Sequence, residues 1–159
     1  MITKSMALTV LSLCVAIGTL CAACVGAPQF TEVQGKEWKL KEIRTDPGET
    51  LFDRRELQSE GFGDNLFTLK FEGDRMAGMA APNRYFGPYE AGQGYDLTIK
   101  NIAGTLMAPF REPEKLKEHE YFIYLQNTYR WNVSNGNLEL FTKDEDGREA
   151  VMFFVNTPE

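Results

Sequence analysis

The residues with the most distinctive chemistry lie close together in the stretch 78–89. Asn83 offers amide donors and an acceptor, and Arg84 offers a positive charge. Tyr85 and Tyr89 add aromatic surface that carries a hydroxyl. In one interpretation, which we favour for the individual residues, turn chemistry shapes a corner here and the tyrosines close the mouth of a barrel with their hydroxyls towards water. In the other, the same side chains form a recognition surface for a protein or peptidoglycan partner.

Catalytic chemistry has little to build on in this sequence. The only histidine, His119, stands between Glu118 and Glu120, and we expect it on the surface. A serine triad would lack the G-x-S-x-G turn, and paired carboxylates do not gather at an evident cleft. We therefore expect a non-enzymatic protein with no catalytic residues and no cofactor.

The acidic turn 144–147 is the one candidate for a metal ion, because its carboxylates could offer oxygens to calcium. The further ligand spacing of an EF-hand loop is missing, and acidic hairpin turns are common. A zinc site of histidine and cysteine is excluded, since all three cysteines lie within the first 24 residues and the chain has a single histidine. We expect no bound metal.

Residues 1–23 predict a signal peptide of the lipoprotein type. Lys4 precedes a nearly uncharged apolar run that extends to Gly26 and is long enough to span a bilayer. Small residues before Cys24 resemble the lipobox of lipoproteins, in a relaxed form because Cys21 stands where an aliphatic residue is usual. We expect lipid attachment at Cys24, through acyl groups such as palmitate, with an ordinary cleaved signal or an uncleaved anchor helix as alternatives.

Acylation at Cys24 predicts that the protein faces the periplasm from a membrane of the cell envelope, since several acyl chains anchor a protein without a transmembrane helix. Residues 24–32 contain Pro28 and no clear period, and they predict a tether. Val25 differs from the aspartate that retains lipoproteins at the inner membrane in some bacteria, which favours the outer membrane.

The composition narrows the expected partners. The chain has 17 Lys and Arg residues against 23 Asp and Glu residues, a formal charge of −6. This balance argues against nucleic acid or anionic lipid headgroups as the main partner. Arg54 and Arg55 stand beside Asp53 and Glu56, so we expect a solvated surface pair. The partners that we expect are the membrane, through the lipid anchor, and an envelope protein.

Residues 33–159 have the length of one domain with one core, and their alternating patterns predict a mainly β fold. We expect about seven to eight antiparallel strands in a curved sheet or small β-barrel, with one helix. The Asn135-Gly136 pair predicts a type I′ hairpin turn. The expected strands are 35–43, 66–71, 75–80, 95–99, 129–133, 138–142 and 150–155.

The expected helix has Pro113 in its first turn, where a missing N–H is harmless. From Glu118 onwards, an apolar stripe at helical spacing would lie against the sheet and end at Tyr129. Glu118 begins this stripe, and a carboxylate that faces inwards needs a partner. Arg84 is the candidate partner; in the alternative, Glu118 is a boundary residue in water.

Two motifs carry a resemblance to a known family. The stretch 78–89 is similar to the signature G-x-x-G-C-N-x-Y-x-G-x-Y of the META domain family, which includes HslJ-like bacterial proteins. Residues 105–109 resemble a second family motif, T-x-M-A-C. Pro82 and Pro109 stand where the family has cysteine, and Ala81 stands where a glycine is usual. The first motif is matched at Gly78, Asn83, Tyr85, Gly87 and Tyr89.

The resemblance covers everything after the tether. It implies a small barrel or strongly curved sheet, and a non-enzymatic role in envelope integrity or stress tolerance. The alternative is a pilot-like module that binds a hydrophobic ligand or a protein, using the interior or the mouth of the barrel. A hollow interior would be lined by Phe67, Leu69, Phe71, Leu97 and Phe153. The candidate binding residues are Asn83, Arg84, Tyr85, Tyr89 and Glu118.

Overall fold

The computed structural model describes residues 29–45, 48–107 and 111–156. The predicted signal peptide, Cys24 and most of the predicted tether lie outside the described residues, as does Pro109. The strands are β1 (Glu37–Thr45), β2 (Thr50–Asp53), β3 (Thr68–Glu72), β4 (Arg75–Met79), β5 (Arg84–Ala91), β6 (Leu97–Ile99), β7 (Ala103–Gly104), β8 (Arg130–Ser134), β9 (Asn137–Lys143) and β10 (Glu149–Asn156). The helices are η1 (Phe30–Glu32), α1 (Arg54–Ser59) and α2 (Glu118–Gln126).

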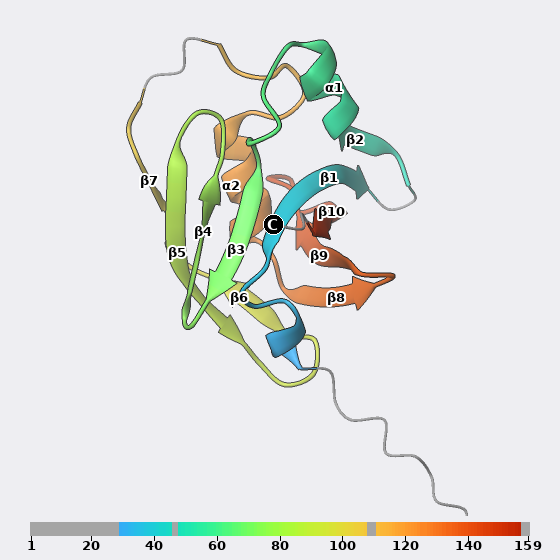
Figure 1. The fold of residues 1–159 in the computed structure, drawn as a ribbon. Helices are drawn as coiled ribbons and strands as arrows, with labels where there is room; N and C mark the ends of the chain where they lie inside the picture. The colour runs from blue at the N-terminus through green and yellow to red at the C-terminus, as the bar shows by residue number, and fades with distance from the viewer. Residues whose placement is uncertain (1–28, 46–47, 108–110, 157–159) are drawn as a thin grey trace, which may run out of the picture.

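The strands form an antiparallel sheet in the order β6-β5-β4-β3-β1-β10-β9-β8, which curves into a nearly closed barrel (Figure 1). β2 pairs with β1 and β7 pairs with β5 beside this path. The two end strands approach each other where Asp96 bridges to Arg130. Here the Trp131 N–H donates to the Tyr95 carbonyl oxygen at 2.9 Å. The predicted fold class is therefore confirmed.

Strand alternation explains which side chains fill the barrel. β5 buries every second residue, so Tyr85 and Tyr89 point inwards while Arg84 and Phe86 point outwards. The predicted hairpin between β8 and β9 is present, with positive φ angles of 52° at Asn135 and 76° at Gly136. The type I′ turn needs such angles at both central positions.

The interior of the barrel is packed with side chains. Phe67, Leu69, Phe71 and Leu97 are buried in one hydrophobic cluster, and the rings of Phe67 and Tyr121 lie 5.0 Å apart between centroids. Four of the five residues expected to line a hollow interior therefore belong to a packed core.

Phe153, the fifth residue, is on the outer face instead of the interior. β10 buries its neighbours Met152 and Phe154, so alternation turns Phe153 outwards. There the Arg44 guanidinium lies over its ring, 5.2 Å from the centroid. The expectation that Phe153 faces the barrel interior is wrong for this reason.

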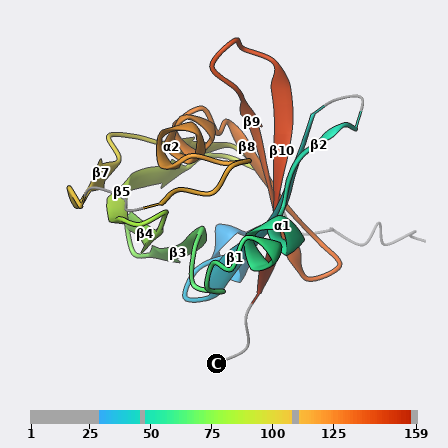
Figure 2. The ribbon, with the colours of Figure 1, turned by 90° about the horizontal axis from the view of Figure 1, so that it is seen from above.

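The helix α2 lies across one end of the barrel, as Figure 2 shows from above. It begins at Glu118, where the Glu120 carboxylate accepts from the Lys117 N–H at 2.7 Å, and it ends at Gln126. The predicted first turn at Pro113 was too early, because this cap starts the helix five residues later. The predicted stripe was too long, because Tyr129 follows the helix and is exposed.

Phe30 closes the other end of the barrel. Its ring packs against Phe71, Tyr89 and Trp131, with centroid distances of 5.0, 5.3 and 5.1 Å. These contacts bury aromatic surface in edge-on and tilted arrangements that aromatic pairs favour. The last residues of the predicted tether therefore pack as part of the domain.

Arg54 joins the sheet where β1 changes partner. One edge of β1 pairs with β3 over its first residues and with β2 over its last residues. At the change of partner, backbone carbonyl oxygens have no strand to pair with. The Arg54 guanidinium donates to the Leu40 and Leu66 carbonyl oxygens at 2.5 and 2.7 Å. The expected surface pair is thus half wrong, because Arg54 is largely buried while Arg55 is exposed and pairs with Asp53.

Candidate functional site

Asn83 is the centre of the predicted corner and is only 4% exposed. Its side-chain amide donates to Glu118 Oε1 at 2.9 Å and to the Met107 carbonyl oxygen at 3.2 Å. Its side-chain oxygen accepts from Thr105 Oγ1 and from the Met107 N–H, both at 2.8 Å. Its own backbone oxygen accepts from the Ala80 N–H at 2.7 Å. The hydrogen-bonding groups of this side chain are therefore used within the fold.

These bonds tie together three segments that are distant in sequence: the corner 80–83, the segment 105–107 and the start of α2. Glu118 accepts from both the backbone and the side-chain amide of Asn83, at 3.0 and 2.9 Å. Glu118 is half-buried and needed a partner, as expected, but the choice of Arg84 was wrong. Arg84 is the first residue of β5 and its side chain is directed to the outside of the sheet.

Tyr85 is buried, and its hydroxyl donates to the Thr68 carbonyl oxygen at 2.6 Å. The Tyr121 hydroxyl of α2 lies 3.0 Å away. Burial, together with the nearby Tyr121, raises the pKa of Tyr85 well above its usual value, and burial also raises the pKa of Tyr121. The expectation that the Tyr85 hydroxyl faces water is wrong, because the strand alternation points it into the core.

Gly78 makes room for this hydrogen bond. A Cβ atom at this position would lie 2.0 Å from the Thr68 carbonyl oxygen and 2.7 Å from the Tyr85 hydroxyl. Both distances are too short for non-bonded atoms, so only glycine fits between the two strands. The first glycine of the motif therefore has a packing role.

Tyr89 belongs to the opposite end of β5 and does not join the corner. It is buried beneath Phe30, and its hydroxyl donates to the Gly73 carbonyl oxygen at 2.8 Å. The Gln34 side-chain amide donates to the same hydroxyl at 2.5 Å. The expectation that this hydroxyl faces water is also wrong, since η1 and the chain after it cover the end of the barrel.

Among the predicted site residues that the structure describes, Arg84 is the exposed one. It borders an open groove of about 490 Å³ on the outer face of β3, β4 and β5. Within the described residues, the Arg84 side chain has no hydrogen bond or ion pair. Phe86, two residues further on the same face, is 48% exposed, and the Arg75 guanidinium lies 5.4 Å from its ring centroid. The groove thus combines aromatic surface with positive charge.

Two exposed apolar residues that the sequence did not indicate follow β7, the strand that pairs with β5. Leu106 is fully exposed and Met107 is 56% exposed, although both are large and apolar. The bonds from Asn83 hold this segment, and the Thr105 N–H donates to the Arg84 carbonyl oxygen at 3.0 Å. The residue types of the motif around Thr105 do not indicate which of its side chains face the solvent.

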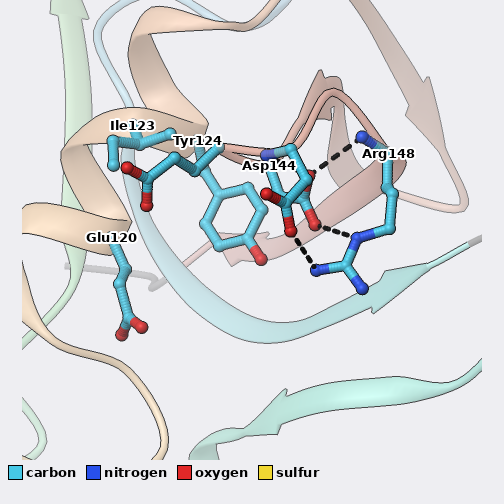
Figure 3. Close-up of a pocket in the computed structure, with 7 residues that line it drawn as sticks. Glu120, Ile123, Tyr124, Asp144 and Arg148 are labelled. Carbon is cyan, nitrogen blue, oxygen red and sulfur yellow. Dashed lines mark hydrogen bonds and ion pairs between the residues drawn. The ribbon is translucent and has the colours of Figure 1, made fainter.

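The acidic turn forms a separate, smaller pocket of about 160 Å³ with the side of α2 that carries Glu120 and Tyr124 (Figure 3). Asp144 accepts from the Arg148 guanidinium at 2.6 Å and from the backbone N–H groups of Asp146 and Arg148, both at 2.9 Å. Burial raises the pKa of Asp144, but these hydrogen bonds outweigh it and hold the pKa below its usual value. The carboxylate is therefore committed to the turn itself.

In the described part of the chain, no group of three or more His, Cys, Asp and Glu side chains could hold a metal ion. His119 is exposed on α2, as expected. Across residues 29–45, 48–107 and 111–156, no helix is long and apolar enough to cross a membrane.

Comparisons with known proteins agree with the motifs. A solved protein from Burkholderia xenovorans is similar to this chain at 18% identity, covering 84% of this chain and 94% of that one, with a TM-score of 0.59. A DUF4847 family protein from Bacteroides vulgatus is similar at 14% identity, covering 82% and 98%, with a TM-score of 0.57. At these identities the likeness concerns the fold alone. No curated protein matches the sequence significantly. The family model of the META domain matches residues 31–156, and the chain therefore belongs to the META domain family.

Proposed function

We propose that this META domain protein is a non-enzymatic binding protein of the bacterial cell envelope. It is anchored through acyl groups on Cys24, faces the periplasm from the outer membrane, and contributes to envelope integrity or stress tolerance. A partner protein docks on the outer face that carries Arg84.

One observation carries the binding part of this proposal: the polar groups of the corner are used within the fold, except for Arg84. Asn83, Tyr85 and Glu118 all form hydrogen bonds inside the domain. Arg84 instead borders a groove. Its side chain has no hydrogen-bond or ion-pair partner among the described residues. An exposed arginine beside aromatic surface is typical of the residues that dominate protein interfaces, where binding removes it from water.

The non-enzymatic part is supported by the placement of the titratable groups. His119 is exposed, and Asp144 is engaged by Arg148 and by backbone N–H groups. The two tyrosines with raised pKa values, Tyr85 and Tyr121, are enclosed in the core. None of these groups is presented to a substrate-sized cleft as an acid, a base or a nucleophile.

The second candidate function, a module that holds a hydrophobic ligand inside the barrel, has less support. Phe67, Leu69 and Phe71 belong to a continuous packed cluster, and α2 and Phe30 cover the two ends. A ligand in the interior would have to displace these side chains, at the cost of their packing. The outer face needs no such rearrangement.

Metabolic labelling with an alkyne analogue of palmitate tests the anchor. The wild-type protein should take up the label and remain with the membranes, whereas Cys24→Ser should lose both the label and the membrane association. A labelled Cys24→Ser protein, or an unlabelled wild-type protein in the soluble fraction, would refute the anchored form.

A complementation assay tests the envelope role. In a strain that lacks the gene, wild-type protein should restore growth in detergent or EDTA, while Cys24→Ser and Arg84→Glu should not, at equal protein levels. Lys115→Glu is the matched control, because it makes the same charge change at an exposed residue outside the groove. Equal growth with and without the gene would contradict the envelope role.

A further inference from the structure

The strand register places one row of side chains across the outer face of four strands. Lys70 of β3 lies opposite Ala77 of β4, Ala77 lies opposite Phe86 of β5, and Phe86 lies opposite Ala103 of β7. The two alanines leave space on both sides of the Phe86 ring, which is 48% exposed. The row therefore presents one aromatic ring between two small side chains.

Positive charges surround this ring. Arg75 lies over it, and Arg84 stands two residues away along the same face of β5. Lys70, at the end of the row, pairs with Glu72 at 2.6 Å. Glu37 is the acidic residue that lines the same groove. The side chains of this face therefore carry a net positive charge, although the formal charge of the whole chain is −6.

An apolar ridge borders the face on the side of β7. Leu106 is fully exposed there, and it follows Thr105, whose N–H donates to the Arg84 carbonyl oxygen. The hydrogen bond from the Met107 N–H to Asn83 keeps the ridge in place before any partner binds. A preformed apolar ridge lowers the entropy cost of binding.

From this arrangement we infer that the face binds an extended peptide segment of another envelope protein, one that carries an acidic side chain and apolar side chains two residues apart, so that they project to the same face. A carboxylate of the segment pairs with Arg84, and neighbouring apolar side chains pack on Phe86 and on Leu106. The inference rests on the proposed function and specifies the chemistry of its partner. Arginine can hold a carboxylate through two parallel hydrogen bonds, which gives this contact direction as well as charge.

The charge distribution favours such a peptide over an anionic membrane surface. A membrane would meet the whole acidic protein, whose net charge opposes approach to negative lipid headgroups. A short segment meets only the face around Arg84 and Arg75, where the local sign is positive. Membrane binding through this face is therefore the competing outcome in the test below.

The test uses the full-length acylated protein in mild detergent and fluorescein-labelled heptapeptides. One set is built on Gly-Leu-Ser-Glu-Ser-Phe-Gly, in which leucine, glutamate and phenylalanine project to one face of an extended chain, with the glutamate position varied, and a matched set has lysine in place of glutamate. Fluorescence anisotropy should show the best acidic peptide binding at least tenfold more tightly than its lysine counterpart. Arg84→Glu should weaken it at least tenfold and Leu106→Ser severalfold, whereas Lys115→Glu should leave it unchanged.

Two results would overturn the inference. The first is equal binding of acidic and basic peptides, or acidic binding that Arg84→Glu leaves intact. The second is binding of the protein to vesicles with 30% phosphatidylglycerol that depends on Arg84, which would assign the face to the membrane. Either result leaves the acyl labelling of Cys24 untouched, so failure here is distinguishable from failure of the proposed function. Circular dichroism of Arg84→Glu and Leu106→Ser would check that both exposed substitutions keep the fold.

Discussion

Asn83 combines in one short side chain two donors and an oxygen with two lone pairs, and the corner uses all of them. Aspartate would lack the donors that meet Glu118 and the Met107 carbonyl oxygen. Alanine would remove the side-chain hydrogen bond to the Glu118 carboxylate and leave the Met107 N–H without its partner. The residue type at this position thus follows from the groups that surround it.

Replacement of Asn83 by alanine should lower the free energy of unfolding by about 2–4 kcal/mol, because several buried groups lose their hydrogen bonds together. Asn132→Ala is the control, since Asn132 makes one hydrogen bond to Glu139 and should cost less than about 1 kcal/mol. Urea denaturation monitored by tryptophan fluorescence measures both. Equal costs for the two variants would argue against a central role for Asn83.

The buried tyrosines predict a loss of stability in alkali. The pKa of Tyr85 and that of Tyr121 are raised in the folded protein, whereas in the unfolded chain both ionise near the usual value of about 10. The unfolded state therefore binds fewer protons above that pH, and stability should fall as pH rises beyond about 10. In the double variant Tyr85→Phe with Tyr121→Phe, urea midpoints between pH 8 and 11 should fall less steeply; an unchanged slope would assign the loss to other groups.

At the residue scale, the sequence predicted where the corner is but not which side chains face inwards. Asn83 and Arg84 are neighbours with similar polarity, and their roles separate only because β5 begins at Arg84. A two-residue alternation that starts at Arg84 would have placed both Arg84 and the Phe86 ring on the outer face. The partner of Glu118 could not be derived, since the contact joins residues 35 positions apart.

The pairing of the strands depends on how closely their backbones can approach, as well as on the pattern of apolar residues. β4 and β3 meet at Gly78, where the Thr68 carbonyl oxygen takes the space of a side chain. Seven of the ten described strands were predictable because alternating residues repeat over several positions. No strand was expected at β2, β5 or β7, and the first part of β5 was interpreted as a corner. The limits of α2 were not predictable, because the apolar spacing continues to Tyr129 after the helix has ended at Gln126.

Gly78→Ala should lower the free energy of unfolding by at least about 2 kcal/mol, because the added methyl group overlaps backbone and a buried hydroxyl. Gly104→Ala is the matched control: its Cβ would make only ordinary contacts of 3.5–3.7 Å, so we expect a change below about 1 kcal/mol. Thermal unfolding followed by circular dichroism compares them. Similar melting temperatures for both variants would contradict the packing role of Gly78.

At the scale of the whole molecule, ion pairs and hydrogen bonds on the surface predict a loss of stability in acid. Hydrogen bonds from the Arg55 side chain and backbone lower the pKa of Asp53 to about 2, and the pKa of Asp144 is also below its usual value. The unfolded chain binds these protons first as pH falls, so stability is complete above about pH 4 and decreases below it. Melting temperatures between pH 7 and 2.5 should show this decrease, and Asp144→Asn should reduce its steepness. A flat profile would mean that these carboxylates contribute little.

The whole barrel followed from the sequence more fully than its surface did. The two-residue alternation of apolar side chains, the turn residues and the family motifs all predicted one antiparallel barrel. They agree because each of them reflects how the strands pack around one core. The groove beside Arg84 depends on how β3, β4, β5 and β7 are aligned, and register is a property of paired strands rather than of one strand's pattern.

We propose that the hydrogen bonds between Asn83 and Glu118 lock the corner to α2 and so hold the outer face ready for a partner. A double-mutant cycle between Asn83→Ala and Glu118→Ala measures this lock directly through the free energies of unfolding of the wild type, both single variants and the double variant. We predict a coupling energy of about 1–3 kcal/mol, since both substitutions remove the same hydrogen bond, from the Asn83 side-chain amide to the Glu118 carboxylate. Costs that add to within about 0.3 kcal/mol would contradict the account.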